Sequence, residues 1–445
     1  KNAPAGGGTN GPGTGGNGTP VPGGATGPAG GRAGGLACGE PKVVPTCEGV
    51  EFVACTPKQG SSGATRLIGT VITPSEVLCN GEVLMDRETG LIECVGASCA
   101  EHPKAGDATV ICADLITPGL IDPHNHMSYN TLPGWKHPNK QYRNRGQWRG
   151  PLARELYDAR LRSDKIAARY NELRLILSGT TSVHKAEGLD SSFDHVRNLD
   201  RGPNANGLGY HDSAFEECVD PLGDRCFDAP NYSEDRNVPA RIYVAHVAEG
   251  VDESSRKEFD TFSEGGQLGS RTTIIHCVAC TSAQFQEMRG AGTHLVWSPR
   301  SNLDLYGATT DVVTALNMGI TVALGPDWTP SGSMNQLEEM RCAQTLSQRY
   351  WKGEIDNQEL VRMVTDGAAA AMGVDDLIGQ LAPNYRADVV TFSGARETPF
   401  ATVIASSPST VQAVFINGTL YYGATDVFNP SIQRNEFCES IDICG

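Results

Sequence analysis

Two histidines in the string LITPGLIDPHNHMSYN have the spacing of a metal-binding pair. His124 and His126 follow an apolar stretch that is interrupted at Pro118 and Gly119. Side chains two residues apart on a strand point to the same face, so both imidazoles can reach one ion. Such pairs also occur by chance on protein surfaces. The pattern predicts a metal site at the end of a strand.

Three later apolar segments also end in residues that can bind a metal. RIYVAHVAE contains His246, TTIIHC contains His276 and TVALGPDW contains Asp327. A divalent ion with three imidazole ligands, one carboxylate and an open position lowers the pKa of bound water from about 15.7 toward 7. We therefore expect metal-bound hydroxide to be the nucleophile. The predicted metal ligands are His124, His126, His246 and Asp327.

Three residues are expected to take part in the chemistry. Glu249, three residues after His246, is predicted to carry the proton from water to the leaving group. His276 is predicted to donate to, or polarise, the group under attack. Asp327 is either the fourth ligand or a base beside the metal water. Structural interpretations remain open: a core histidine, a capping aspartate and, for Glu249, one acid of a solvated loop.

The surrounding segments predict the elements that position these residues. Residues 153–178, 281–289 and 308–318 have helical patterns, whereas TTSV, HLVWS and ITVAL resemble buried strands. Strands that alternate with helices and end in ligand residues are typical of a TIM-type (β/α)8 barrel. Short strands near both ends of the chain predict a small β-sandwich built from N- and C-terminal segments. The expected fold class is therefore α/β.

The predicted domains follow from these changes of pattern. The first 35 residues are Gly- and Pro-rich and have almost no apolar side chain to bury, so they are expected to be a flexible arm. The predicted domains are the arm over residues 1–37, the first part of the β-sandwich over 38–117, the hydrolase barrel over 118–384, the second part of the β-sandwich over 385–432 and a Cys-bearing tail over 433–445.

Composition limits the classes of partner. The 445-residue chain is 39% hydrophobic, and about 410 residues remain for the globular part once the arm is set aside. A net charge of −16 without a Lys/Arg cluster argues against nucleic acid and anionic membranes. The sequence contains no run of eighteen apolar residues, so no membrane span is expected.

Cysteine usage predicts disulfides in an exported protein. The chain has 14 Cys, an even number, and several lie in close pairs. It begins at Lys1, so we expect that a secretory signal was removed. A zinc site at the CxxC of Cys277 and Cys280 is the alternative. We expect a secreted, cell-surface or periplasmic location. The close pairs are Cys94/Cys99, Cys218/Cys226, Cys277/Cys280 and Cys438/Cys444.

Five motifs, PGLIDPHNH, HVAE, IIHC, SPRSN and LGPDW, occur in this order. Residues 65–425, which contain them, resemble the amidohydrolase superfamily, in particular its one-metal branch of deaminases, triazine hydrolases and imidazolonepropionase. The resemblance assigns Asp327 both the ligand and the base role. It implies one divalent ion, zinc first, with iron and manganese as alternatives. Lys185 suggests a bridging lysine for two metals, but HVAE and GPDW match the one-metal branch.

The residues expected to bind substrate lie in two segments. Arg300 and Asn302, in SPRSN, could bind a carboxylate or an amide, although Arg300 has a structural ion pair as its alternative. Trp135, Tyr142 and Trp148 lie in a polar, aromatic loop after the first barrel strand. Such loops often close over substrate, and ordinary surface packing is the alternative.

Two functions follow from these features. The first is a secreted metal-dependent amidohydrolase that attacks a non-peptide C–N bond of a cyclic amide or amidine in a small molecule. The alternative is an extracellular structural subunit of a filament or other polymer, in which the Gly-rich arm and the disulfides mediate assembly. We expect a homo-oligomer, and a filamentous assembly would form through the arm.

Overall fold

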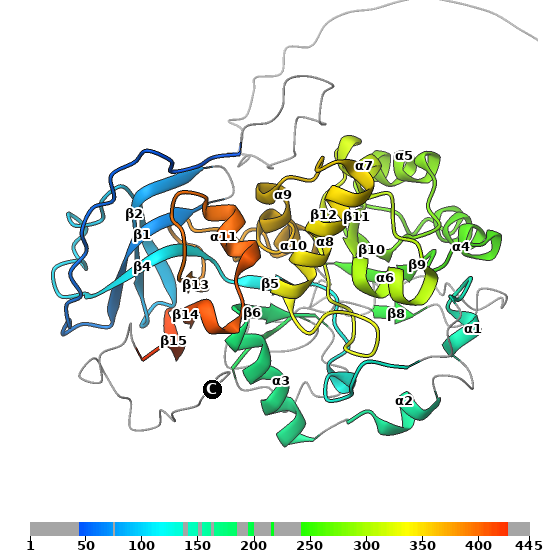
Figure 1. Ribbon diagram of the computed structural model, residues 1–445, viewed down its shortest axis with the longest axis horizontal. Helices are drawn as coiled ribbons and strands as arrows, with labels where there is room; N and C mark the ends of the chain where they lie inside the picture. The colour runs from blue at the N-terminus through cyan, green and yellow to red at the C-terminus, as the bar shows by residue number, and fades with distance from the viewer. Residues whose placement is uncertain are drawn as a thin grey trace, which may run out of the picture.

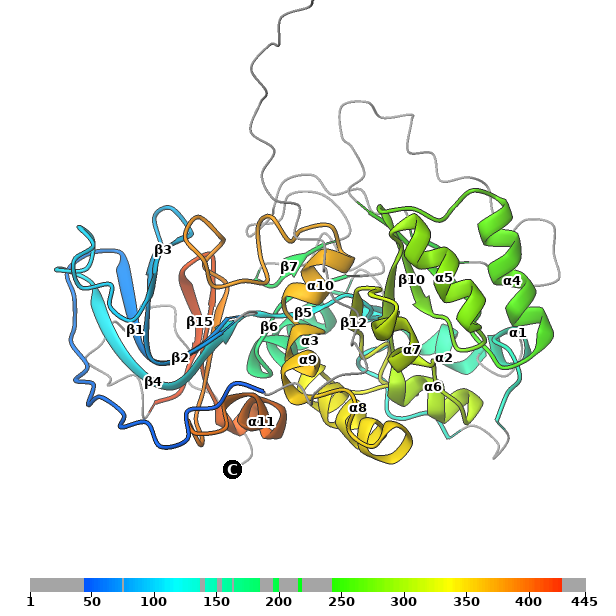
Figure 2. The ribbon, with the colours of Figure 1, turned by 90° about the horizontal axis from the view of Figure 1, so that it is seen from above.

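The computed structural model consists of a β-sheet unit and a unit of parallel strands surrounded by helices (Figure 1). Figure 2 shows the sheet unit at one end and α4 to α7 at the other. The structure describes residues 44–73, 76–136, 141–149, 154–161, 164–184, 195–199, 215–217 and 242–425. The predicted arm, the Cys-bearing tail, Lys185 and the pairs Cys218/Cys226 and Cys438/Cys444 lie outside these residues.

The sheet unit joins both ends of the described chain, as expected for the α/β fold. Its strand order is β15-β14-β13-β4-β1-β2-β3, in one seven-stranded sheet. Antiparallel pairing of β13 with β4 connects the N- and C-terminal segments. Strands from both segments share one apolar cluster, which includes Leu67, Val83 and Phe415. The strands are β1 (Ala64–Ile72), β2 (Val77–Asp86), β3 (Leu91–Gly96), β4 (Thr109–Pro118), β13 (Val389–Phe392), β14 (Val411–Ile416) and β15 (Thr419–Gly423).

One apolar run passes from the sheet unit into the parallel strands. It forms β4, is interrupted at Gly119, and resumes as β5 (Leu120–Asp122). A Cβ at Gly119 would lie 2.2 Å from Thr181 Oγ1, so no other side chain fits between the strands. The interruption at Pro118 and Gly119 is therefore the crossing point between the two units.

The parallel strands form two arcs, β5-β6-β7 and β12-β11-β10-β9-β8, which together supply eight strands. This is the number found in TIM barrels. An isolated parallel bridge between Asn125 and Asp327 connects the two arcs beyond β5 and β12. Within the described residues no pairing joins β7 to β8. The further strands are β6 (Thr180–Val183), β7 (Arg197–Asn198), β8 (Phe215–Glu217), β9 (Tyr243–Val247), β10 (Thr272–His276), β11 (His294–Trp297) and β12 (Val322–Leu324).

The helix expected over residues 153–178 is wrong as a single element. The structure has α2 (Arg154–Ala159) and, separately, α3 (Lys165–Leu177). Asp164 accepts hydrogen bonds from the backbone of Ile166 and Ala167, so a helix N-cap lies inside the predicted run.

The remaining helices agree in place with the expected alternation. Of the helices in the described part, none is long and apolar enough to cross a membrane. They are α1 (Gly146–Arg149), α4 (Glu253–Glu264), α5 (Ser282–Ala291), α6 (Pro299–Tyr306), α7 (Val312–Asn317), α8 (Gln336–Trp351), α9 (Asn357–Arg362), α10 (Asp366–Ala371) and α11 (Pro399–Ala405).

Disulfides are concentrated in the sheet unit. Three of the four described bonds lie there, and the fourth joins Cys277 to Cys280 directly after β10. The alternative of zinc at this CxxC is wrong, because the two sulfurs are bonded to each other. The bonds in the sheet unit are Cys47–Cys79, Cys55–Cys112 and Cys94–Cys99.

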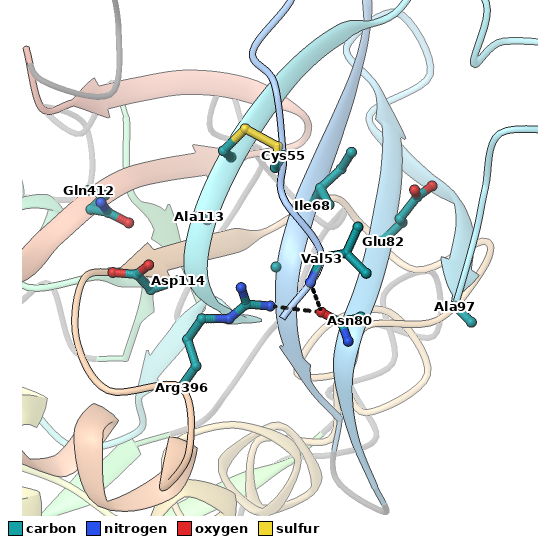
Figure 3. Close-up of a pocket in the computed structure, with 12 residues that line it drawn as sticks. Val53, Cys55, Ile68, Asn80, Glu82, Ala97, Ala113, Asp114, Arg396 and Gln412 are labelled. Atoms are coloured by element: carbon teal, nitrogen blue, oxygen red, sulfur yellow. Dashed lines mark hydrogen bonds between the residues drawn. A yellow bond between two sulfur atoms is a disulfide. The ribbon is translucent and has the colours of Figure 1, made fainter. Parts of the chain in front are cut away.

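A pocket of about 290 Å³ lies on the sheet unit, with Arg396, Asn80 and Asp114 among its lining residues (Figure 3). Its polar groups are largely bonded to the protein itself. Arg396 donates to the carbonyl of Cys79 at 2.8 Å, and Asn80 Oδ1 accepts from the amide of Val53 at 2.9 Å. None of the predicted site residues lines this pocket.

Candidate metal centre

The two histidines of the opening motif lie just beyond β5 rather than on it. β5 ends at Asp122, so the expectation that both imidazoles project from one strand is wrong. Asp122 Oδ1 accepts from the amide of His124, and Oδ2 accepts from the Asn125 side chain at 2.5 Å. A buried aspartate therefore shapes the turn that presents His124 and His126.

Four predicted ligands converge. His124 Nε2 lies 3.3 Å from His126 Nε2 and 3.1 Å from His246 Nε2. Asp327 Oδ1 lies 3.4 Å from His124 Nε2 and 3.3 Å from His126 Nε2. All four side chains are buried. We call these four residues the metal-ligand cluster.

The donor set of this cluster fits a divalent ion. A tetrahedral ion with bonds of ~2.0–2.1 Å separates its ligand atoms by ~3.3 Å, and the four separations given above are 3.1–3.4 Å. His124, His126 and His246 form one group whose ligand atoms lie within 4.8 Å of one another, and Asp327 belongs to a second group with His124. Imidazole nitrogens and carboxylate oxygens are typical zinc ligands. The roles of these residues as ligands remain predictions, and the geometry is compatible with them.

His276 lies against the same cluster. With His124 and Asp327 it forms a second group whose ligand atoms lie within 4.8 Å of one another. Burial lowers the pKa of His276, so the ring is neutral at pH 7. Its Nδ1 lies 2.9 Å from Asn302 Oδ1, which can only accept, so the ring proton is on Nδ1. Nε2 then carries a lone pair and no proton. His276 could donate a hydrogen bond from Nε2, as predicted, only if the ring took up a second proton.

The predicted proton carrier is next to His276. Glu249 is only 4% exposed, and its Oε1 lies 3.8 Å from His276 Nε2. Tyr306 donates a hydrogen bond of 2.6 Å to the same oxygen, and Arg145 Nη1 lies 3.8 Å from Oε2. Glu249 is therefore a buried carboxylate with defined neighbours rather than an acid of a solvated loop.

Four non-glycine residues at this site have left-handed backbone conformations. Their φ angles are 56° at Ala248, 71° at His276, 52° at Cys277 and 66° at Asp327. This conformation costs ordinary residues of order 1–3 kcal/mol and tends to occur at functional sites. The turns after β9, β10 and β12 are thus strained where they present the candidate residues.

Helix α6 supplies supporting residues that the sequence analysis missed. Ser298 Oγ lies 2.8 Å from His124 Nδ1, and Ser301 Oγ donates to Asp327 Oδ2 at 2.6 Å. Such outer hydrogen bonds orient metal ligands. The buried positions here have the spacing of one helix face: 298, 301, 302, 305 and 306. Helical periodicity from SPRSN onward could therefore have identified them.

The two predicted substrate-binding residues of SPRSN have different surroundings on α6. Asn302 is fully buried and bonds His276. Arg300 is exposed and donates from Nε to Ser333 Oγ at 2.7 Å, on another side of α6. Their roles in substrate binding stay predictions, but the structure brings only Asn302 to the metal-ligand cluster.

The loop after β5 packs into a cluster of aromatic side chains beside the histidines. Trp328 lies 6.2 Å from the His126 ring and 5.4 Å from Trp148, between ring centroids. Trp135, the third predicted substrate residue, stacks on Tyr142 at 6.2 Å. We call this group the aromatic cluster. Its buried members are the aromatic residues Tyr129, Tyr142, Trp148, Tyr306 and Trp328 and the leucines Leu156 and Leu305.

Sequence comparisons find relatives that act on adenosine derivatives. The model described as "Amidohydrolase family" matches residues 236–421. A 5-methylthioadenosine/S-adenosylhomocysteine deaminase of Halobacterium salinarum is 26% identical over 375 residues, which cover 74% of this chain and 84% of that protein. A 5'-deoxyadenosine deaminase of Methanopyrus kandleri is 23% identical over 404 residues, covering 79% and 92%.

Solved structures show the same fold. An adenosine deaminase from Xanthomonas campestris with bound zinc superposes with a TM-score of 0.61 at 16% identity, covering 82% of this chain and 94% of that one. A zinc complex of atrazine chlorohydrolase from Arthrobacter aurescens gives 0.62 at 19% identity, covering 81% and 94%. The predicted α/β fold and superfamily resemblance are confirmed.

Proposed function

Because residues 236–421 match the amidohydrolase family model and the relatives to which this chain is similar are named as deaminases, we propose that the chain is a metal-dependent deaminase. The bond attacked would be the exocyclic C–N bond of a cyclic amidine, as in an aminopurine nucleoside. The observation that carries this proposal is the convergence of His124, His126, His246 and Asp327 next to the buried Glu249.

The residues of the cluster support such a reaction. When bound, a divalent cation supplies Lewis acidity and makes hydroxide available near neutral pH. Ser301 donates to Asp327 Oδ2, which leaves Oδ1 facing His124 and His126 as the oxygen that would bind the ion. Glu249 would take a proton from the attacking water and deliver it to the departing amino nitrogen, so that ammonia leaves and a carbonyl remains.

The surroundings favour a flat substrate. Trp328 directly follows Asp327, and its ring lies 5.4 Å from Trp148 and 5.1 Å from Tyr129. Aromatic side chains bind planar rings by stacking or edge contacts. A heteroaromatic ring beside this cluster would have its amino group near Glu249.

Release of ammonia from aminopurines, and of chloride from a chlorotriazine, tests the proposal. Adenosine, 5'-methylthioadenosine, S-adenosylhomocysteine, guanine and a chlorotriazine are supplied to protein whose metal content has been measured. We expect stoichiometric divalent metal, turnover of an adenosine derivative, and loss of turnover on chelation that zinc restores. Metal-free native preparations, or no ammonia from any aminopurine, would exclude this function.

We also propose that the protein is exported, because disulfides persist in oxidising compartments. The four described disulfides support this location. Titration of free thiols in unreduced protein, isolated from its source, tests it: reactive thiols at these cysteines would contradict export. The alternative as a polymer subunit depends on the arm over residues 1–37, which lies outside the described residues, so it stays a prediction.

A further inference from the structure

A chain of hydrogen bonds from two helices, α6 and α1, reaches Glu249. Tyr306, the last residue of α6, donates to Glu249 Oε1 at 2.6 Å. Trp148, in α1, donates from Nε1 to the Tyr306 hydroxyl at 2.9 Å. All three side chains are buried, with exposed fractions of 7% or less. The carboxylate after β9 is thus linked to elements far away in the sequence.

The direction of this chain is determined by its donors and acceptors. An indole nitrogen can only donate, so the Tyr306 oxygen accepts from Trp148 and its own proton is directed to Glu249. Burial and the neighbouring Glu249 raise the pKa of Tyr306 well above its ordinary value. The phenol therefore keeps its proton at neutral pH.

The nearby Arg145 makes its hydrogen bonds to groups other than Glu249. Arg145 Nη1 lies 3.8 Å from Glu249 Oε2, too far for a hydrogen bond, and it donates to the carbonyl of His246 at 3.1 Å. Its Nη2 bonds the carboxylate of Glu258. Among the described residues, Tyr306 is the hydrogen-bond donor that contacts Glu249 directly.

We propose that Tyr306, supported by Trp148, is a positioning residue that fixes the Glu249 carboxylate beside the metal-ligand cluster. The hydrogen bond to Oε1 holds that oxygen 3.8 Å from His276 Nε2. This inference rests on the proposed function, in which Glu249 transfers the proton. The hydrogen bonds of Tyr306 are to Glu249 and Trp148 and not to the metal-ligand cluster, so it acts through Glu249.

Two graded substitutions test the role on the metal-loaded full chain. Tyr306→Phe keeps the ring in the aromatic cluster and removes the hydroxyl, and we expect kcat to fall about tenfold to a hundredfold with little change in KM. Trp148→Phe removes the supporting donor and should have a smaller effect of the same kind. Tyr385→Phe, which removes a hydroxyl bonded to the Asp375 carbonyl in another region, is the matched control and should retain wild-type kcat.

A double substitution separates positioning from a general structural effect. If Tyr306 acts through Glu249, adding Tyr306→Phe to Glu249→Gln should cause no further loss of kcat. Multiplicative losses, a rise in KM with unchanged kcat, or wild-type turnover in Tyr306→Phe would overturn the proposal.

Crystal structures of the wild-type and Tyr306→Phe proteins give a readout that does not depend on turnover. We expect the Glu249 carboxylate to rotate away from His276, or to lose order, only in the variant. An unmoved carboxylate would overturn the inference. Absence of any turnover in the wild type would exclude the proposed function instead, and the two structures would still decide the position of Glu249.

Discussion

The sheet unit and the metal centre differ in what stabilises them. In the sheet unit, three disulfides each join a loop to a strand, and a partly exposed lysine, Lys104, bonds both Asp86 and Glu93 at 2.6 Å. At the metal centre, strained turns present buried polar side chains, and the supporting contacts come from separate loops. Residues that stabilise the fold are therefore largely separate from those that would perform chemistry.

The difference has a physical reason. Buried charges and left-handed backbone conformations reduce stability unless the surroundings compensate for them. A covalently tied sheet, continuous with β5 through Gly119, provides a stable base from which β5 and the loop after it extend. Changes in one region should thus alter turnover with little change in stability, and changes in the other should do the reverse.

The largest expected effect is on turnover. Glu249→Gln keeps the size and an acceptor oxygen for Tyr306 but cannot transfer the proton, so we expect kcat to fall about 100-fold to 10,000-fold. Thermal unfolding should shift by only about 2 °C. Glu253→Gln, on the exposed first turn of α4, is the control and should match wild type. Retained turnover in Glu249→Gln would refute the role of Glu249. It would also contradict the assignment of chemistry to the metal centre and of stability to the sheet unit.

The next effect is on stability. Replacing Cys55 and Cys112 by alanine opens a cross-link with a sequence separation of 57, and chain entropy predicts a loss of about 4 kcal/mol in the free energy of unfolding. Denaturant unfolding measures this loss, and kcat at 25 °C should be unchanged.

A matched control comes from the shorter bond in the same sheet. Cys94 and Cys99 are separated by 5, so removing that bond should cost about 2 kcal/mol. Equal losses for both pairs would contradict the entropic explanation. A fall in kcat of the folded Cys55/Cys112 variant would show that the sheet unit shapes the metal centre directly.

The smallest effect concerns pH. Burial acts to raise the pKa of Asp86, but hydrogen bonds from Lys104 and the Glu88 amide prevail and lower it. The stabilisation is therefore complete above the unfolded pKa of 3.8 and is lost as the pH falls through the lower folded pKa.

Asp86→Asn should reduce the free energy of unfolding by about 0.5–1 kcal/mol at pH 7, because the partner Lys104 is partly exposed. The difference from wild type should shrink below pH 4 as the wild-type carboxylate protonates. Urea unfolding at several pH values measures it, with the exposed Glu101→Gln as control. A pH-independent difference would rule out the charge as its source.

Sequence patterns predicted most of the fold and the identity of the candidate residues. Apolar strands ending in His246, His276 and Asp327 were recognisable because a parallel strand needs continuous apolar residues and presents its ligands at one end. The break between α2 and α3 was missed, since the capping role of Asp164 is a weak local signal inside a helical pattern.

The supporting residues of the centre could not be derived in the same way. Tyr306 and Trp148 are 158 positions apart, and Arg145 reaches Glu258 from another loop. No local periodicity relates such residues, because their contacts depend on how separate loops fold over one another.

The sequence by itself determined the order of strands and helices, the set of ligand-type residues and their likeness to the amidohydrolase superfamily, because these depend on local pattern and residue chemistry. Only the tertiary structure decided that His124 and His126 lie beyond the strand, that His276 presents a lone pair, and that Glu249 is bonded by Tyr306. These features depend on which groups come within hydrogen-bond distance when the chain packs. No single residue of the sequence determines such a distance.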